Sequence, residues 1–248
     1  MSRTEVSIPM PEGSARAFVF TPDQGEGPWP TAVIFMDAPA IRPSLFEMGE
    51  RLASHGYYVL LPDMFWRLGP YEPIDLQAVF RDEAVRREVF GKMTGSTNPQ
   101  KAVADMAVWF DWLEKQPKAK ADKIGVTGYC MGGGLALRAA GNFPDRVVAA
   151  GAFHPGNVAT DAPDSPHLLA PKTKAKVLVG GADQDAGFDE AQKDRLDKAF
   201  RDAGVEAEVG IWAGAKHGYV PTDMPVYNKD AAERHWRELI ALFDSKLK

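Results

Sequence analysis

The sequence predicts an α/β protein with a mostly parallel central sheet and helices on both faces. Short β-rich runs alternate along the chain with longer segments of helical period. The loops between them are short and rich in Gly, Pro and Asp. No fixed repeat and no low-complexity linker divides the chain, so we expect one domain over residues 1–248. Strands that alternate with helices through short loops imply a parallel sheet covered on both sides.

The first part of the chain carries three expected strands and one expected helix. The strands are expected at 17–20, 31–36 and 57–61, and 22–30 is a Gly/Pro-rich turn. Residues 44–54 place apolar side chains at helical spacing, and Gly56 follows as a stop signal.

The pattern loosens between 63 and 97. An aromatic patch of Phe65, Trp66 and Tyr71 is followed by a charged segment at 76–90 that we expect to be helical. We interpret 63–97 as an insertion or lid.

From Asn98 onward the alternation is regular again. Asn98-Pro99 is typical of a helix start, and the helix that follows carries one apolar stripe: Val103, Met106, Ala107, Phe110 and Leu113. Strands are expected at 123–127, 147–153, 176–179 and 207–212, and helices at 135–141, 189–203 and 231–247.

Composition excludes several classes of protein. With 45% hydrophobic and 25% charged residues, the 248-residue chain is neither collagen-like nor mostly disordered. The 29 Lys and Arg against 34 Asp and Glu give a net charge of −5 without a basic stripe, so we do not expect nucleic acid as a partner. No signal peptide or spanning run is visible, and we therefore expect no membrane partner and a cytoplasmic location.

The single cysteine, Cys130, cannot form an internal disulfide, which leaves core filler, metal ligand or reactive thiol. It lies in Gly128-Tyr129-Cys130-Met131-Gly132-Gly133, between an expected strand and an expected helix. This is the G-x-nucleophile-x-G pattern in the strand, turn and helix context that it requires. The helix N-terminus also favours negative charge on the sulfur. A buried structural cysteine is the ordinary alternative, but the glycines favour a nucleophile.

A cysteine nucleophile needs a base and an acid that orients the base. In this architecture both follow later strands, in the chain order nucleophile, acid, base. His217 follows the 207–212 strand, and Asp183 follows the 176–179 strand. Asp185 and Asp189 lie in the same loop as alternatives, with Asp183 nearest the strand end and Asp189 placed to cap the next helix.

The remaining histidines do not indicate a metal centre. His55 and His235 fall on expected helices and are expected to be exposed or at a boundary, and His154 follows a strand and could line the site. Five scattered histidines with one cysteine give no zinc spacing. We expect neither a metal nor another cofactor.

The motifs G-Y-C-M-G-G, G-G-A-D and A-G-A-K-H-G resemble those of the dienelactone hydrolase family of α/β hydrolases, over nearly the whole chain. The resemblance implies the α/β-hydrolase fold and a Cys130, His217 and Asp183 triad. It also implies an oxyanion hole made by the backbone N–H groups of Met131 and Ala38.

Two positions depart from the family pattern. The family has a Glu that contacts the resting thiol directly after the third strand of its sheet, where this chain has the shorter Asp37. It also binds a substrate carboxylate through an Arg four residues after the catalytic His, where this chain has Pro221. Arg42 and Arg81 (or Arg86) remain as carboxylate partners, and Trp66 and Tyr219 as apolar walls.

The expected activity is hydrolysis of a small-molecule ester or lactone through a thioester on Cys130, by a monomer or homodimer. The alternative is a non-hydrolytic ligand-binding or redox-responsive protein on the same fold, which the departures at Asp37 and Pro221 motivate.

Overall fold

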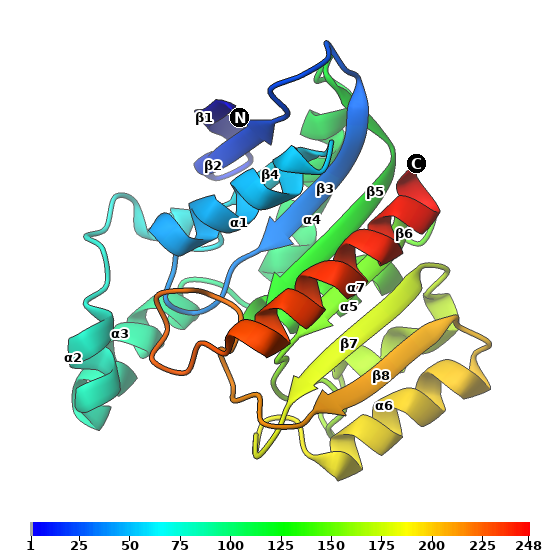
Figure 1. Ribbon diagram of the computed structural model, residues 1–248. Coiled ribbons are helices and arrows are strands. Elements are labelled where there is room, and N and C mark those ends of the chain that lie inside the picture. Colours follow the sequence, from blue (N-terminus) through cyan, green and yellow to red (C-terminus); the bar gives the residue numbers. More distant parts are fainter. Residues whose placement is uncertain (1) are drawn as a thin grey trace.

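One eight-stranded sheet runs through the protein, whose computed structural model describes residues 2–248 (Figure 1). Its strand order is β1-β2-β4-β3-β5-β6-β7-β8. β2 pairs antiparallel with β1 and β4, and the other neighbours are parallel. The strands are β1 (Ser2–Met10), β2 (Gly13–Thr21), β3 (Trp29–Phe35), β4 (Tyr58–Pro62), β5 (Ala119–Tyr129), β6 (Val147–Phe153), β7 (Lys176–Ala182) and β8 (Ala207–Trp212).

Helices cover both faces of this sheet. α1 and α7 pack on one face, and α4, α5 and α6 pack on the other (Figure 1). α2 and α3 lie apart from both layers. The helices are α1 (Pro43–Ser54), α2 (Leu76–Arg81), α3 (Glu83–Gly95), α4 (Pro99–Glu114), α5 (Met131–Asn142), α6 (Glu190–Asp202) and α7 (Lys229–Leu247), with short 3-10 turns η1 (Trp66–Leu68) and η2 (Pro166–Lys172).

The predicted α/β class is confirmed, and most predicted elements are present within a few residues of their expected ends. β1 was not expected, because apart from Ile8 and Met10 its side chains are exposed or half-buried and give no apolar run. The single helix expected at 76–90 is two helices, since Asp82 has extended backbone and its carboxylate caps α3 by accepting the N–H groups of Ala84 and Val85.

The buried face of α4 is shifted from the expected stripe. Trp109 is fully buried, whereas Val103 and Ala107 are only half-buried. Asp105 is also buried on this helix, because it accepts hydrogen bonds from η1.

The parallel strands bring the loops that carry the predicted site to one edge of the sheet. Their carboxyl ends point towards the side where α2 and α3 lie (Figure 1). The loops after β3, β5, β7 and β8 carry Asp37, Cys130, Asp183 and His217 respectively. Residues distant in sequence therefore meet where catalytic groups of open α/β sheets are usually found.

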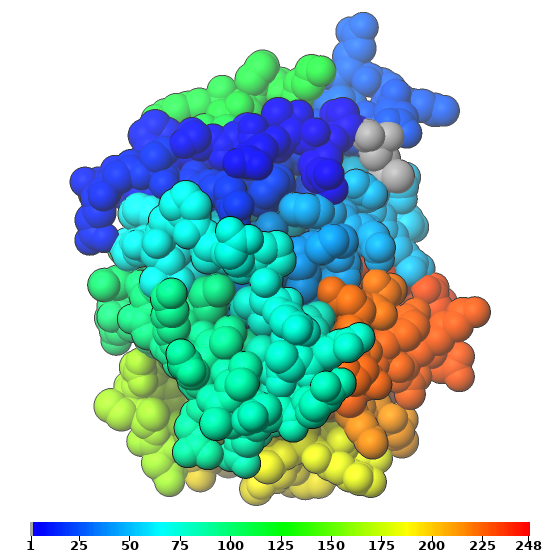
Figure 2. All heavy atoms as spheres, turned by 90° about the vertical axis from the view of Figure 1, so that its left-hand side faces the viewer, coloured from blue at the N-terminus to red at the C-terminus, as the bar shows by residue number. Residues whose placement is uncertain are grey.

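Segment 63–97 covers much of this side. In Figure 2, which shows that side of the molecule, the segment spreads below the N-terminal hairpin and beside the loop that leads into α7. Its two helices are thinly packed, since α2 buries only Val79 and α3 only Met93.

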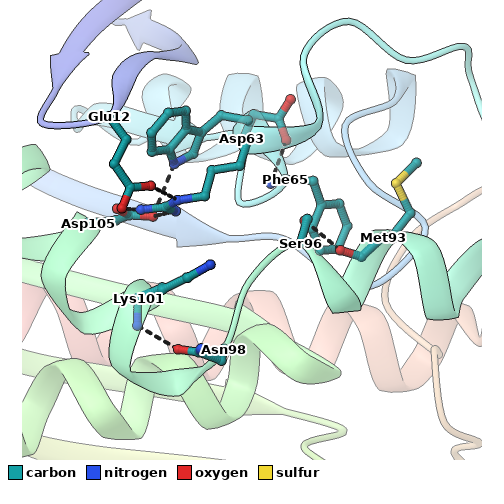
Figure 3. Close-up of polar contacts among 10 residues, drawn as sticks. Glu12, Asp63, Phe65, Met93, Ser96, Asn98, Lys101 and Asp105 are labelled. Carbon is teal, nitrogen blue, oxygen red and sulfur yellow. Dashed lines mark hydrogen bonds and ion pairs between the residues drawn. The ribbon is translucent and has the colours of Figure 1, made fainter.

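The start of the segment is fixed to helix α4 by polar contacts (Figure 3). Asp105 accepts hydrogen bonds from the indole N–H of Trp66 at 3.0 Å and from the Arg67 guanidinium at 2.7 and 2.9 Å. Asp63 accepts the N–H of Phe65 at 2.9 Å. Because its two helices bury few side chains, we expect this segment to have less local stability than the sheet.

Candidate active site

Cys130 sits on a sharp turn between β5 and α5 that only a glycine frame can form. Its backbone has φ 55° and ψ −119°, a strained conformation for a residue with a side chain. A Cβ on Gly128 would overlap the carbonyl oxygen of Gly132, and a Cβ on Gly132 would overlap that of Phe35. The glycines therefore allow the turn to close and leave the Cys130 side chain partly exposed. This is the geometry predicted from the motif.

The N–H of Cys130 is held from β6. It donates to the carbonyl oxygen of Phe153 and to Nδ1 of His154, each at 3.1 Å. His154 is fully buried and has a positive φ of 37°. Because burial and the neighbouring His217 and His235 lower its pKa well below the usual value, His154 is neutral and can accept this hydrogen bond.

His217 is oriented by Asp185, not by Asp183. Nδ1 of His217 lies 2.6 Å from Oδ2 of Asp185, whose side chain is only 8% exposed. Asp183 instead accepts the backbone N–H of Gly214 at 3.2 Å. The hydrogen bond with His217 is therefore made by Asp185, one of the alternatives, and not by Asp183, which was predicted from its closeness to the strand end. The chain turns at Gln184, which has φ 58°, and the carboxylate that reaches the histidine is the one beyond the turn.

The charges of this group are coupled. Burial alone would lower the pKa of His217, but hydrogen bonds with Asp185 and Cys130 and their negative charges raise it to about 10. Burial raises the pKa of Asp185, but the hydrogen bond with His217 outweighs this and holds it below the usual range. The site thus favours a protonated imidazole between the Asp185 carboxylate and the Cys130 side chain.

The two backbone N–H groups predicted to form an oxyanion hole are those of Met131, directly after Cys130, and Ala38, after β3. Met131 is the first residue of α5, so its N–H has no acceptor within the helix. The N–H of Ala38, after β3, donates to no acceptor among residues 2–248. The N–H of Cys130 itself is occupied by β6 and His154. No hydrogen bond within residues 2–248 uses the N–H of Met131 or of Ala38, as the predicted oxyanion hole requires.

Asp37 and Arg42 form a buried ion pair. Both carboxylate oxygens of Asp37 accept from the guanidinium, at 2.5 and 2.9 Å. Nε of Arg42 donates to Asp223, in the loop after His217, at 2.8 Å. The expected contact of Asp37 with the thiol is absent from the hydrogen bonds of residues 2–248, because Arg42 occupies both oxygens.

The structure does not bring the other side chains expected to contact substrate, Trp66, Tyr219 and Arg81, together beside Cys130. Trp66 is buried against η1 and α4, and its N–H donates to Asp105. Tyr219 is fully buried, donates to the carbonyl oxygen of Gly180 at 3.1 Å and packs edge-on against His154. Arg81 is exposed on α2. Tyr219 therefore supports the site from behind instead of forming a wall that a substrate touches.

His235 was also misjudged, since it is fully buried instead of exposed. Its Nε2 lies 2.9 Å from the hydroxyl of Tyr129, directly before the nucleophile. The position of His235 on a helix did not indicate from sequence that it would contact Tyr129.

Within the described residues, no cluster of three or more His, Cys, Asp or Glu could hold a metal ion. No helix within residues 2–248 is long and apolar enough to cross a membrane.

The strand order, the strained cysteine turn and the His and Asp on later loops together define an α/β hydrolase. The model of the dienelactone hydrolase family matches residues 15–247, and the chain belongs to that family.

Named relatives agree with this assignment. A Methylorubrum extorquens protein named "Putative carboxymethylenebutenolidase" is 29% identical over 95% of this chain and 78% of its own length. The crystal structure of a "Putative Dienelactone Hydrolase" from Klebsiella pneumoniae superposes with a TM-score of 0.85 at 22% identity, covering 98% of each chain. A dienelactone hydrolase from Anabaena variabilis gives a TM-score of 0.69 at 18% identity, covering 100% of this chain and 99% of its own.

Proposed function

We propose that this hydrolase cleaves carboxylic esters or lactones through a Cys130, His217 and Asp185 triad. The observation that carries the proposal is the position of His217, which hydrogen-bonds Asp185 on one side and interacts with Cys130 on the other. A nucleophile, a base and a group that orients the base are thus contiguous.

In the first half of the reaction, the Cys130 thiolate attacks the ester carbonyl carbon and the carbonyl π electrons move onto oxygen. The N–H groups of Met131 and Ala38 stabilise the resulting oxyanion. When the oxyanion collapses, the bond to the alkoxy oxygen breaks, and protonated His217 gives its proton to the departing alcohol. The product is a thioester on Cys130.

In the second half, His217 is neutral and accepts a proton from a water molecule as its oxygen attacks the thioester carbonyl. Collapse of this second intermediate breaks the carbon–sulfur bond and releases a carboxylic acid. The thiolate and the protonated His217 are restored. Asp185 keeps the Nδ1–H of His217 directed away from the substrate throughout, so that Nε2 performs both proton transfers.

The test compares the hydrolysis of 4-nitrophenyl acetate and of a simple lactone by wild type, Cys130→Ala and His217→Gln. We expect each substitution to lower kcat by at least about 10³-fold, since triad members act as a unit. Near-ultraviolet circular dichroism of each variant checks that the fold is kept.

Equal rates in wild type and Cys130→Ala would contradict the role of the thiol. If wild type hydrolysed no ester or lactone but reacted readily with iodoacetamide, the non-hydrolytic alternative would replace this proposal.

A further inference from the structure

We propose that the site selects neutral esters or lactones and discriminates against substrates that carry a carboxylate. This inference rests on the proposed function and names its substrate class. Its basis is the buried guanidinium of Arg42, in the loop between β3 and α1 that also contains Ala38. The charge of this guanidinium is neutralised within the protein.

All three nitrogens of the Arg42 guanidinium have protein partners. Nη1 and Nη2 pair with Asp37, Nε pairs with Asp223, and Nη1 also donates to the carbonyl oxygen of Ala40 at 3.1 Å. The side chain of Arg42 is 6% exposed and that of Asp37 is 2% exposed. A substrate carboxylate could reach Arg42 only by displacing a partner, and it would then leave a buried carboxylate unpaired, which is strongly unfavourable.

The cluster also carries excess negative charge. Two carboxylates, Asp37 and Asp223, face a single guanidinium. The Asp185 carboxylate is paired with the protonated His217 and does not add to this excess. An anionic substrate would therefore meet like charge beside the reacting carbonyl, whereas a neutral substrate would not.

The exposed cations near these loops offset little of this charge. Pro221 supplies none. Arg81 on α2 and Lys216 next to His217 are exposed, and pairs made by exposed side chains contribute little in water.

Segment 63–97, which covers this side of the molecule, also carries more carboxylates than cations around its groove. It contains an apolar groove of about 490 Å³, which includes Val79, Val89 and Met93 in its lining. The charged side chains of the lining are one lysine against three carboxylates: Lys92, Glu72, Asp75 and Glu88. Apolar and acidic surface of this kind accommodates a neutral ligand more readily than an anion.

The experiment compares two substrates that differ only in charge at the far end. Methyl 4-nitrophenyl adipate is neutral, and mono-4-nitrophenyl adipate ends in a carboxylate at neutral pH. We expect kcat/KM to be about 10- to 100-fold higher for the neutral ester, because like charges brought together oppose binding.

Two variants change the charge beside the site. Pro221→Arg adds a cation, and Asp223→Asn releases one partner of Arg42. Each should reduce the ratio of neutral to anionic kcat/KM by at least about fivefold through the same electrostatic effect. Asp202→Asn, on the outer surface of α6, removes a carboxylate elsewhere and should leave the ratio unchanged. The ratio is taken within one protein sample, so it does not depend on the folded fraction.

An equal or higher kcat/KM for the anionic ester in wild type would overturn this inference while leaving the proposed function intact. A ratio that shifts as much in Asp202→Asn as in Pro221→Arg would also overturn it. Hydrolysis of neither ester would contradict the proposed function itself.

Discussion

At the scale of single residues, Cys130 is held by contacts on both sides of its turn. The N–H of Cys130 is tied to Phe153 and His154, and its side chain faces His217. The rings of His154 and His217 lie edge to face with centroids 5.2 Å apart. A neutral His154 places no second positive charge beside the protonated His217 of the proposed reaction.

The two aspartates of the loop after β7 give a matched test of the triad. Asp185→Asn should lower kcat by about 10²- to 10⁴-fold, because an amide no longer stabilises the protonated His217 or selects its tautomer. Asp183→Asn should change kcat by less than about threefold, since it alters only an exposed hydrogen bond from the backbone N–H of Gly214 and no contact with His217. Steady-state kinetics with 4-nitrophenyl acetate measure both. A larger loss in Asp183→Asn would return the role to the residue expected from sequence.

The proximity of Cys130 and His217 could be predicted from sequence, because glycines and chain order constrain where those side chains can point. The acid was less constrained. Three aspartates lie within seven residues, from 183 to 189, and a single left-handed residue, Gln184, decides which one faces the histidine. The pairing of Asp37 with Arg42 was likewise hidden, because it depends on the course of a loop between β3 and α1.

At the scale of elements, the turn from β5 to α5 depends on close backbone approach. The first turn of α5 lies against the end of β3, where a side chain at 132 would meet the carbonyl oxygens of Phe35 and Met36. Two positions further on, a Cβ at Gly134 would make only an ordinary contact of 3.6 Å with Val158. The same helix thus contains one glycine that is required and one that is not.

Gly132→Ala should therefore lower the free energy of unfolding by about 3 kcal/mol or more, because the backbone must shift to admit the methyl group. Gly134→Ala should be neutral or raise it by up to about 1 kcal/mol, since alanine favours the helix. Urea denaturation followed by circular dichroism measures both changes. Equal effects at the two positions would show that the close approach at 132 is not what requires glycine.

The helices of segment 63–97 were the hardest to predict from sequence. Its irregular pattern was recognisable, but the break at Asp82 was not, because a charged helix with few buried residues gives little periodicity to read. The buried contacts of Asp105 with Trp66 and Arg67, which fix the base of the segment, link parts of the chain nearly 40 residues apart. Such contacts leave no local signal.

At the scale of the whole molecule, the fold class followed from the alternation of strands and helices, which is imposed by burial along the entire chain. The eight-stranded sheet brings four separate loops to one edge, and segment 63–97 covers that side. The acidic cluster of Asp37, Arg42 and Asp223 then joins the loop after β3 to the loop after His217. We base the proposed preference for uncharged substrates on this cluster of charges.

The most direct test of this account is the mass of the intact protein during turnover. After rapid mixing with 4-nitrophenyl acetate and acid quenching, wild type should gain one acetyl group, located on Cys130 by peptide mapping and removed by neutral hydroxylamine, as a thioester requires. Cys130→Ala should gain none. Steady hydrolysis by Cys130→Ala at the wild-type rate, or an acetyl group mapped to another residue in an active wild-type sample, would contradict the assignment of Cys130 as the nucleophile.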